Sequence, residues 1–140
     1  METATATAPT STKTLVGAYL VNGTMGNIGM PGAPIMHFSL IVVPNAHSVT
    51  GTVTITQALA PPNGEIIVRN VTGVIRKTGL GKVTQIVALE GEYTVSVPPP
   101  AIGTYLAKFS AHMAIDNNWE GRGGFSYGNN HIEDVPVTKN

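Results

Sequence analysis

The residues best suited to proton transfer or metal binding at neutral pH are the four histidines, His37, His47, His112 and His131. No two of them lie within five residues of each other, so the sequence has no local zinc motif. Distant strands could still bring His37 and His112 together, because both fall on polar faces of predicted strands. We expect ordinary surface histidines, and we predict neither a metal site nor a cofactor.

Ser110, His112 and Asp116 supply the side-chain types of a nucleophilic triad. They follow one another along a single predicted strand, where side chains at every second position stand in a row. That spacing is poor for the hydrogen bond by which a histidine activates a serine. We therefore expect a protein without enzymatic activity.

The segment Asp116–His131 holds the only tryptophan, several amides and carboxylates, and glycines that permit close approach. Sugar recognition needs an aromatic face for the C–H side of the ring and planar polar groups for its hydroxyls. Tight hairpins and a core aromatic need the same residue types, so both interpretations stay open. The candidate ligand-binding residues are Asp116, Asn118, Trp119, Glu120, Arg122, Tyr127, Asn129, Asn130 and His131.

A glycine-rich loop, Gly23–Gly32 (GTMGNIGMPG), has no lysine after it and no predicted helix, so it does not cradle phosphate. Its apolar residues are Met25, Ile28 and Met30, and methionines form adaptable contact surfaces. The loop therefore either caps one end of the fold or contacts a partner, and we count these three residues as candidate assembly residues.

Residues 1–14 are rich in threonine and alanine, with Thr3, Thr5 and Thr7 at every second position. This spacing fits an extended strand that could add to the open sheet edge of a neighbour, so these threonines are further candidate assembly residues. The segment lacks the charged and apolar regions of a secretory signal peptide. We expect a cytoplasmic protein, or one exported without a cleaved signal peptide.

The chain has 140 residues, of which 11% are charged, and eight basic side chains balance eight acidic ones. Without a basic stripe it is a poor nucleic-acid binder, and without a long apolar run it has no membrane-spanning segment. It has no cysteine, and its length fits one domain with a core of its own.

Short segments that alternate between apolar and polar residues recur along the chain, separated by Gly, Pro and Asn. They predict an all-β domain over residues 15–140, preceded by an arm at 1–14. We expect a single antiparallel β-sandwich, because the long glycine-rich connection suits a crossover between sheets, with a small closed barrel as the alternative. About eight strands are expected, at 15–22, 34–43, 47–58, 65–77, 83–97, 102–115, 119–127 and 131–137.

The stretch from Thr24 to Leu40, with VTGVIRKTGLG from Val71 and LEGEYTVSVPPPAIGTYLA from Leu89, resembles a family of small uncharacterised bacterial all-β domains of unknown function. The resemblance covers roughly Leu15 to Val137 and implies a bacterial source. It carries no catalytic motif, so no residue role is transferred from it.

Two functions fit these observations. The first is a non-enzymatic, self-associating structural module that forms a homo-oligomer through its N-terminal arm, since near-zero net charge removes repulsion between copies and open sheet edges accept strands. The alternative is a lectin-like module that binds an uncharged glycan through the 116–131 region.

Overall fold

The computed structural model describes residues 17–58, 64–79, 81 and 83–140, so the predictions for Thr3, Thr5 and Thr7 lie outside the described residues. Its elements are eight strands and one short 3-10 turn at Pro44–Ala46. The strands are β1 (Tyr19–Met25), β2 (Ile35–Val43), β3 (Ser48–Thr56), β4 (Glu65–Lys77), β5 (Gln85–Ser96), β6 (Thr104–Ile115), β7 (Gly121–Tyr127) and β8 (Asn130–Lys139).

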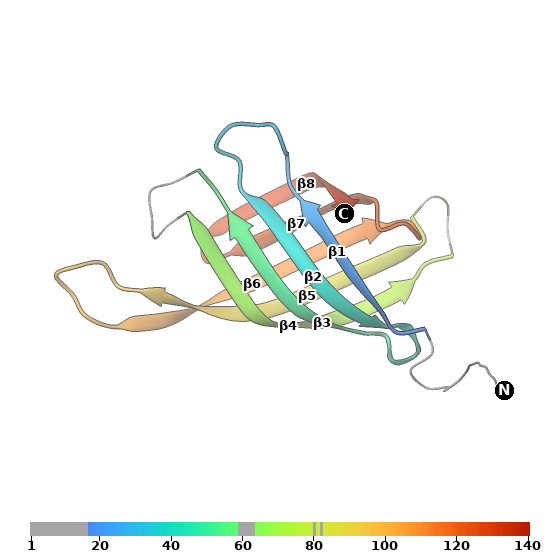
Figure 1. Ribbon diagram of the computed structural model, residues 1–140, viewed down its shortest axis with the longest axis horizontal. Coiled ribbons are helices and arrows are strands. Elements are labelled where there is room, and N and C mark those ends of the chain that lie inside the picture. Colours follow the sequence, from blue (N-terminus) through green and yellow to red (C-terminus); the bar gives the residue numbers. More distant parts are fainter. Residues whose placement is uncertain (1–16, 59–63, 80, 82) are drawn as a thin grey trace.

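Each strand pairs antiparallel with the next along the chain, and β1 pairs with β8 to close a barrel (Figure 1). The all-β class and the eight antiparallel strands are confirmed. Of the two predicted arrangements the structure has the closed barrel, not the sandwich. The glycine-rich connection explains the difference, because it joins two neighbouring strands, with Met25 opposite Met36, and makes no crossover.

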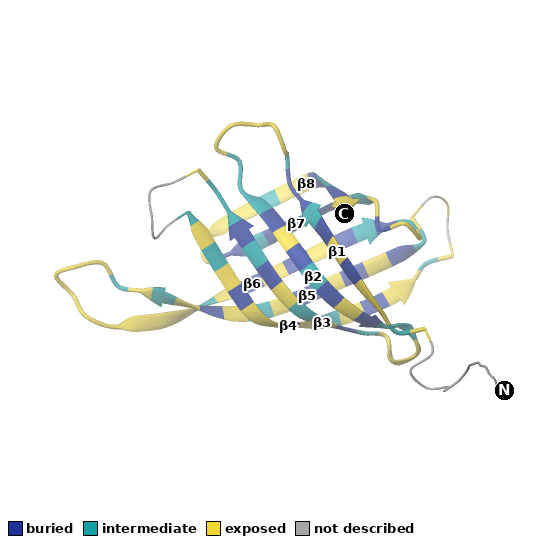
Figure 2. Ribbon diagram, in the orientation of Figure 1, coloured by how far each residue is buried: buried dark blue, intermediate teal, exposed yellow. Residues whose placement is uncertain are grey.

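The barrel is filled by the apolar side chains that alternate along its strands. Phe38, Leu40, Leu89, Phe109 and Phe125 are buried, and every strand contributes at least one residue to the same core. In Figure 2 the buried and exposed positions alternate along the strands as a pleated sheet requires. The core therefore holds the barrel in shape and leaves the outer face as the surface for function.

Strand β7 lies very close to its neighbours because three of its residues are glycines. A Cβ atom at Gly121 would overlap the carbonyl of Ala114, and one at Gly123 would press on the sulfur of Met25. The β7–β8 register also shifts between Gly123 and Phe125, which is a bulge. These features let the sheet curve tightly enough to close.

Strands β5 and β6 pair with each other beyond the point where β4 and β7 stop pairing with them. Strand β4 pairs with β5 only as far as Thr72 opposite Glu90, and β7 pairs with β6 only as far as Tyr127 opposite Phe109. The outer part of this hairpin therefore projects beyond the barrel, at one end of the longest axis of the molecule (Figure 1). In the part of the chain that the structure describes, no helix is long and apolar enough to cross a membrane.

Candidate functional site

The structure divides the predicted sugar-binding residues between the two ends of the barrel. Asp116, Asn118, Trp119 and Glu120 lie in the β6–β7 loop, whereas the β7–β8 turn carries the later members of the set. Strand β7 separates the two groups by roughly 20 Å at about 3.3 Å per residue. The 116–131 segment therefore does not form one binding site.

The β6–β7 loop is held by one carboxylate. Asp116 accepts hydrogen bonds at Oδ1 from the backbone N–H groups of Asn118 at 2.8 Å and Glu120 at 3.0 Å. Between them Trp119 adopts a left-handed conformation with φ of 59°, which is rare for a bulky residue. The polar groups predicted to hold a sugar thus shape this turn and direct Trp119 toward the barrel.

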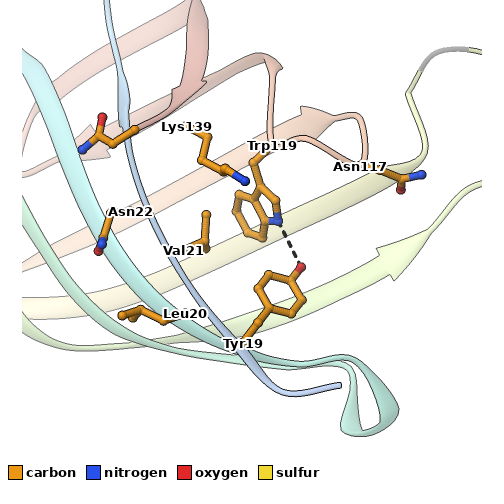
Figure 3. A pocket seen from close by; sticks show the side chains of 8 residues that line it. Tyr19, Leu20, Val21, Asn22, Asn117, Trp119 and Lys139 are labelled. Carbon is orange, nitrogen blue, oxygen red and sulfur yellow. Dashed lines mark hydrogen bonds between the residues drawn. The ribbon is translucent and has the colours of Figure 1, made fainter. Parts of the chain in front are cut away.

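Trp119 is only 2% exposed, and its indole N–H donates to the hydroxyl of Tyr19 at 3.0 Å. Its ring lies 5.9 Å from that of Phe38 between centroids. A sugar ring therefore has no access to its aromatic face. Instead, Trp119 reaches Tyr19 (Figure 3) and covers the seam between β1 and β8. There Gly23–Met25 pair with Val137–Lys139, and single backbone hydrogen bonds join Asn140 to Asn22 and Gly26 to Pro136.

Beside this aromatic pair the seam opens into a cleft of about 330 Å³. Asn117, on one wall, accepts hydrogen bonds at Oδ1 from Thr84 and from Gln85. The cleft is lined by Tyr19, Leu20, Val21, Asn22, Asn117, Trp119, Lys139 and Asn140. The sequence did not indicate this site, because it joins the two ends of the chain to a loop between them.

At the opposite end of the barrel, the candidate residues Tyr127, Asn130 and His131 do not share one set of contacts. Tyr127 is buried, which raises the pKa of its phenol above the ordinary value. Asn130 donates to the carbonyl of Tyr127 at 3.3 Å, while Asn129 is exposed in the turn. Arg122, near the start of β7, forms an exposed ion pair with Asp134 at 2.6 Å.

Sequence reasoning missed a contact between Ser126 and His131, whose Oγ and Nδ1 atoms lie 2.9 Å apart. Residues Gly124–Gly128 have the Gly-x-Ser-x-Gly spacing of hydrolases, which was the available signal. That motif works at a strand-to-helix turn, whereas Ser126 lies within strand β7 and is paired with β6 and β8. No carboxylate of the described residues contacts His131, so the pair lacks the third member of a triad.

The other histidines do not converge either. His37 bonds to Thr56 at 3.2 Å on β3, and His112 faces Glu133 at 3.4 Å on the exposed side of the barrel. Within the described ranges, no group of three His, Asp or Glu residues could hold a metal ion.

The candidate assembly residues of the glycine-rich loop behave differently from one another. Met25 is fully buried in the core, so the prediction that it belongs to a contact surface is wrong. Its position in β1 places the side chain inside the barrel. Ile28 and Met30 are exposed in the β1–β2 loop and remain available for contact.

Another uncovered apolar feature is the outer part of the β5–β6 hairpin, residues 93–107, which we call the projecting hairpin. It contains no charged residue and no histidine. Its exposed side chains include Ile102 at 99%, Tyr105 at 57% and Leu106 at 63%. Most of the hairpin is coloured as exposed in Figure 2. Exposed sheet edges normally carry charges that prevent pairing with other chains, and this hairpin lacks that protection.

The nearest charged side chains lie at the base of the projecting hairpin, where it joins the barrel. There Lys108 forms an ion pair with Glu92 at 3.3 Å, so the two charges offset each other. Tyr93 is the last buried side chain before the tip, and burial raises the pKa of its phenol, with smaller contributions from Tyr105 and Tyr127. The sequence signal for the hairpin was the length of the predicted strands 83–97 and 102–115, together with their lack of charge around the turn.

Comparison with known proteins places the chain in a family. The chain matches no curated protein. The model of the family described as "Domain of unknown function (DUF1842)" matches residues 16–132, and the predicted resemblance to a family of domains of unknown function is confirmed. A match over most of the chain means that this protein belongs to the DUF1842 family.

Proposed function

We propose that this protein is a non-enzymatic, self-associating β-module and that two copies meet through their projecting hairpins. The observation that carries the proposal is an uncharged run, residues 93–107, that extends beyond the barrel with Tyr105 and Leu106 exposed. Exposed apolar residues gathered on one uncharged element commonly mark a protein contact. The whole chain also has no net charge, so identical copies do not repel each other.

The expected association is reversible. Burying a large apolar side chain contributes about 1.5–3 kcal/mol, whereas association costs at least about 4 kcal/mol in lost freedom of motion. A standard interface uses about 20–30 residues on each side, which is more than the hairpin supplies. We therefore expect a weak dimer whose population depends on concentration.

An association through the N-terminal arm, or with a glycan, has less support than association through the projecting hairpin. Thr3, Thr5 and Thr7 lie outside the described residues, so the support for an arm contact is their spacing alone. A glycan would have to bind without Trp119, whose face is covered, and without the 116–131 residues acting together. An uncharged glycan in the seam cleft therefore remains the alternative partner, with the amide of Asn22 and the hydroxyl of Tyr19 as its polar contacts.

Sedimentation velocity over a range of concentrations tests the proposal. We expect the unmodified chain to shift from monomer to dimer, and Leu106→Lys to move that shift to at least about 10-fold higher concentration, because two new charges would meet in the interface. Ile41→Lys is the matched control, since it adds the same charge at an exposed residue of β2 in the barrel wall. A chain without residues 1–14 shows whether the arm adds to association.

Two results would overturn the proposal. One is an unmodified chain that sediments as a monomer even at about 1 mM, where a contact of −4.1 kcal/mol would be half formed. The other is equal weakening by Leu106→Lys and Ile41→Lys, which would show that added charge matters and the hairpin does not.

A further inference from the structure

The outer edge of β6 carries backbone groups that no neighbouring strand uses. Val97 N–H donates to the carbonyl of Gly103 at 2.9 Å on the β5 side, and Gly128 N–H donates to the carbonyl of Lys108 at 3.1 Å on the β7 side. Backbone groups alternate between the two sides along a strand. Thr104 and Leu106 therefore point their N–H and C=O groups to the β7 side, beyond the end of β7.

Strand β7 stops at Tyr127, opposite Phe109, so no strand among the described residues pairs with Thr104 or Leu106 on that side. We propose that this edge pairs antiparallel with the same edge of a second copy, around a twofold axis at Tyr105. The inference rests on the proposed function and names the strand and register through which it works.

The position of the twofold axis follows from the unpaired backbone N–H and C=O groups of Thr104 and Leu106. An axis at Tyr105 sets Thr104 opposite Leu106 of the partner subunit, and residues directly opposite each other at such positions exchange both N–H···O bonds. By symmetry Leu106 meets Thr104 of the partner subunit, and every free group of both residues is then used. An axis at Leu106 would instead bring the partner chain opposite Lys108, whose carbonyl already binds Gly128 in the β7–β8 turn.

Side chains also fit this register. Tyr105 would lie opposite Tyr105 of the partner subunit in a pair without direct hydrogen bonds, where side chains approach most closely. Aromatic pairs across strands are favourable, and this one would cover a residue that is now 57% exposed. On the other face, the two copies of Leu106 lie diagonally within reach of each other.

Charge favours a second copy of the chain as the occupant of the β6 edge. Charge also favours pairing through β6 over pairing through β5. The β6 edge is uncharged from Ile102 to Ala107, so two identical edges meet without like charges facing. The β5 edge is also open beyond Glu90, but Glu92 lies on it and both glutamates are exposed. Pairing β5 with itself would gather carboxylates from both copies, which is unfavourable.

Single cysteines test the register cleanly, because the chain contains none of its own. In the Tyr105→Cys variant the two facing Cα atoms would be about 4.5 Å apart, within the range that a disulfide spans. We expect mild oxidation to convert most of this variant to a covalent dimer. Thr94→Cys, exposed on the open β5 edge, is the matched control and should give roughly 10-fold less dimer.

A proline pair gives a second measurement, in case loss of the Tyr105 ring weakens association. Leu106→Pro removes an N–H that faces open solvent in the monomer, where an edge strand tolerates proline, yet that N–H bonds across the proposed dimer. We expect association roughly 10-fold weaker or more, with an unchanged circular dichroism spectrum. Thr94→Pro removes the equivalent N–H from the β5 edge and should leave association unchanged.

The outcomes separate the two proposals. Crosslinking of Tyr105→Cys with weakened association of Leu106→Pro supports the β6 register. If the unmodified chain dimerises while the two β5 variants show the effects instead, or while neither pair does, the register is overturned and self-association stands. An unmodified chain that is monomeric at every concentration overturns both.

Discussion

The strand pairing of the barrel runs out at two places, the β1–β8 seam and the projecting hairpin, and the chain treats them differently. At the seam Gly23–Met25 pair with β8, with one further backbone hydrogen bond on each side at Asn22 and Gly26. Trp119 covers the opening and bonds to Tyr19 (Figure 3). At the hairpin no described residue covers Tyr105 or Leu106, which stay exposed. One gap is closed within the chain, and the other stays open among the described residues.

Strand β6 shows that burial here depends on neighbours and not on the residue pattern. Tyr105 and Phe109 lie on the same face of one strand, yet Tyr105 is 57% exposed and Phe109 is 1% exposed. The difference is the presence of β7 beside Phe109 and its absence beside Tyr105. An alternating pattern therefore predicts which face is apolar, while the pairing of adjacent strands decides whether that face is covered.

The largest expected effect is the loss of the seam cover. Trp119→Ala should lower the free energy of unfolding by about 3–5 kcal/mol, because it empties a buried aromatic site. Leu106→Ala, on the uncovered hairpin, should change it by less than about 0.5 kcal/mol at concentrations where the chain is monomeric. Urea unfolding measures both values. Equal losses would show that the two gaps do not differ.

A smaller effect is expected from the hydrogen bond at the seam alone. Tyr19→Phe keeps the ring but leaves the buried indole N–H of Trp119 without its acceptor, which costs about 1–3 kcal/mol. Thermal unfolding of this variant should occur at a lower temperature than that of the unmodified chain. Tyr105→Phe is the matched control on the hairpin, and a loss as large as that of Tyr19→Phe would contradict the comparison.

The last effect appears only at alkaline pH, at the boundary between the barrel and the hairpin. Burial raises the pKa of Tyr93 and Tyr127 above their ordinary value of 10.0. The folded chain thus favours the neutral phenols, so this stability is fully present below pH 10.0 and falls as the pH rises through the folded pKa values. Urea unfolding between about pH 8 and pH 11 measures the fall, and Tyr93→Phe should make it shallower. An unchanged slope in that variant would show that Tyr93 does not contribute.

Much of the fold could be predicted from alternation and turn residues, but closure and the site could not. The segments around Phe38, Val53 and Val87 were placed in strands because apolar residues recur there at every second position. Whether these strands make a sandwich or a barrel depends on the β1–β8 pairing, a contact between residues far apart in the sequence. Local patterns carry no information about it.

The candidate site shows the same limit. Trp119 and Tyr127 are close in sequence, but an intervening strand carries them to opposite ends of the barrel. Conversely, the Trp119–Tyr19 bond joins residues a hundred positions apart. Met25 was misplaced because its glycine-rich neighbours indicated a loop, whereas its pairing with Met36 and Val137 holds it in the barrel wall.

The position of the hairpin limits where a pair of copies could contact further copies. The hairpin leaves the barrel at one end of the longest axis, and β1 begins at the other end (Figure 1). Two copies joined at their hairpins would therefore form a dumbbell, with the barrels at its ends and both β1 strands starting on its outer poles. Such a unit is bivalent, and an added contact at the poles would extend it into a linear chain without enlarging the pair itself.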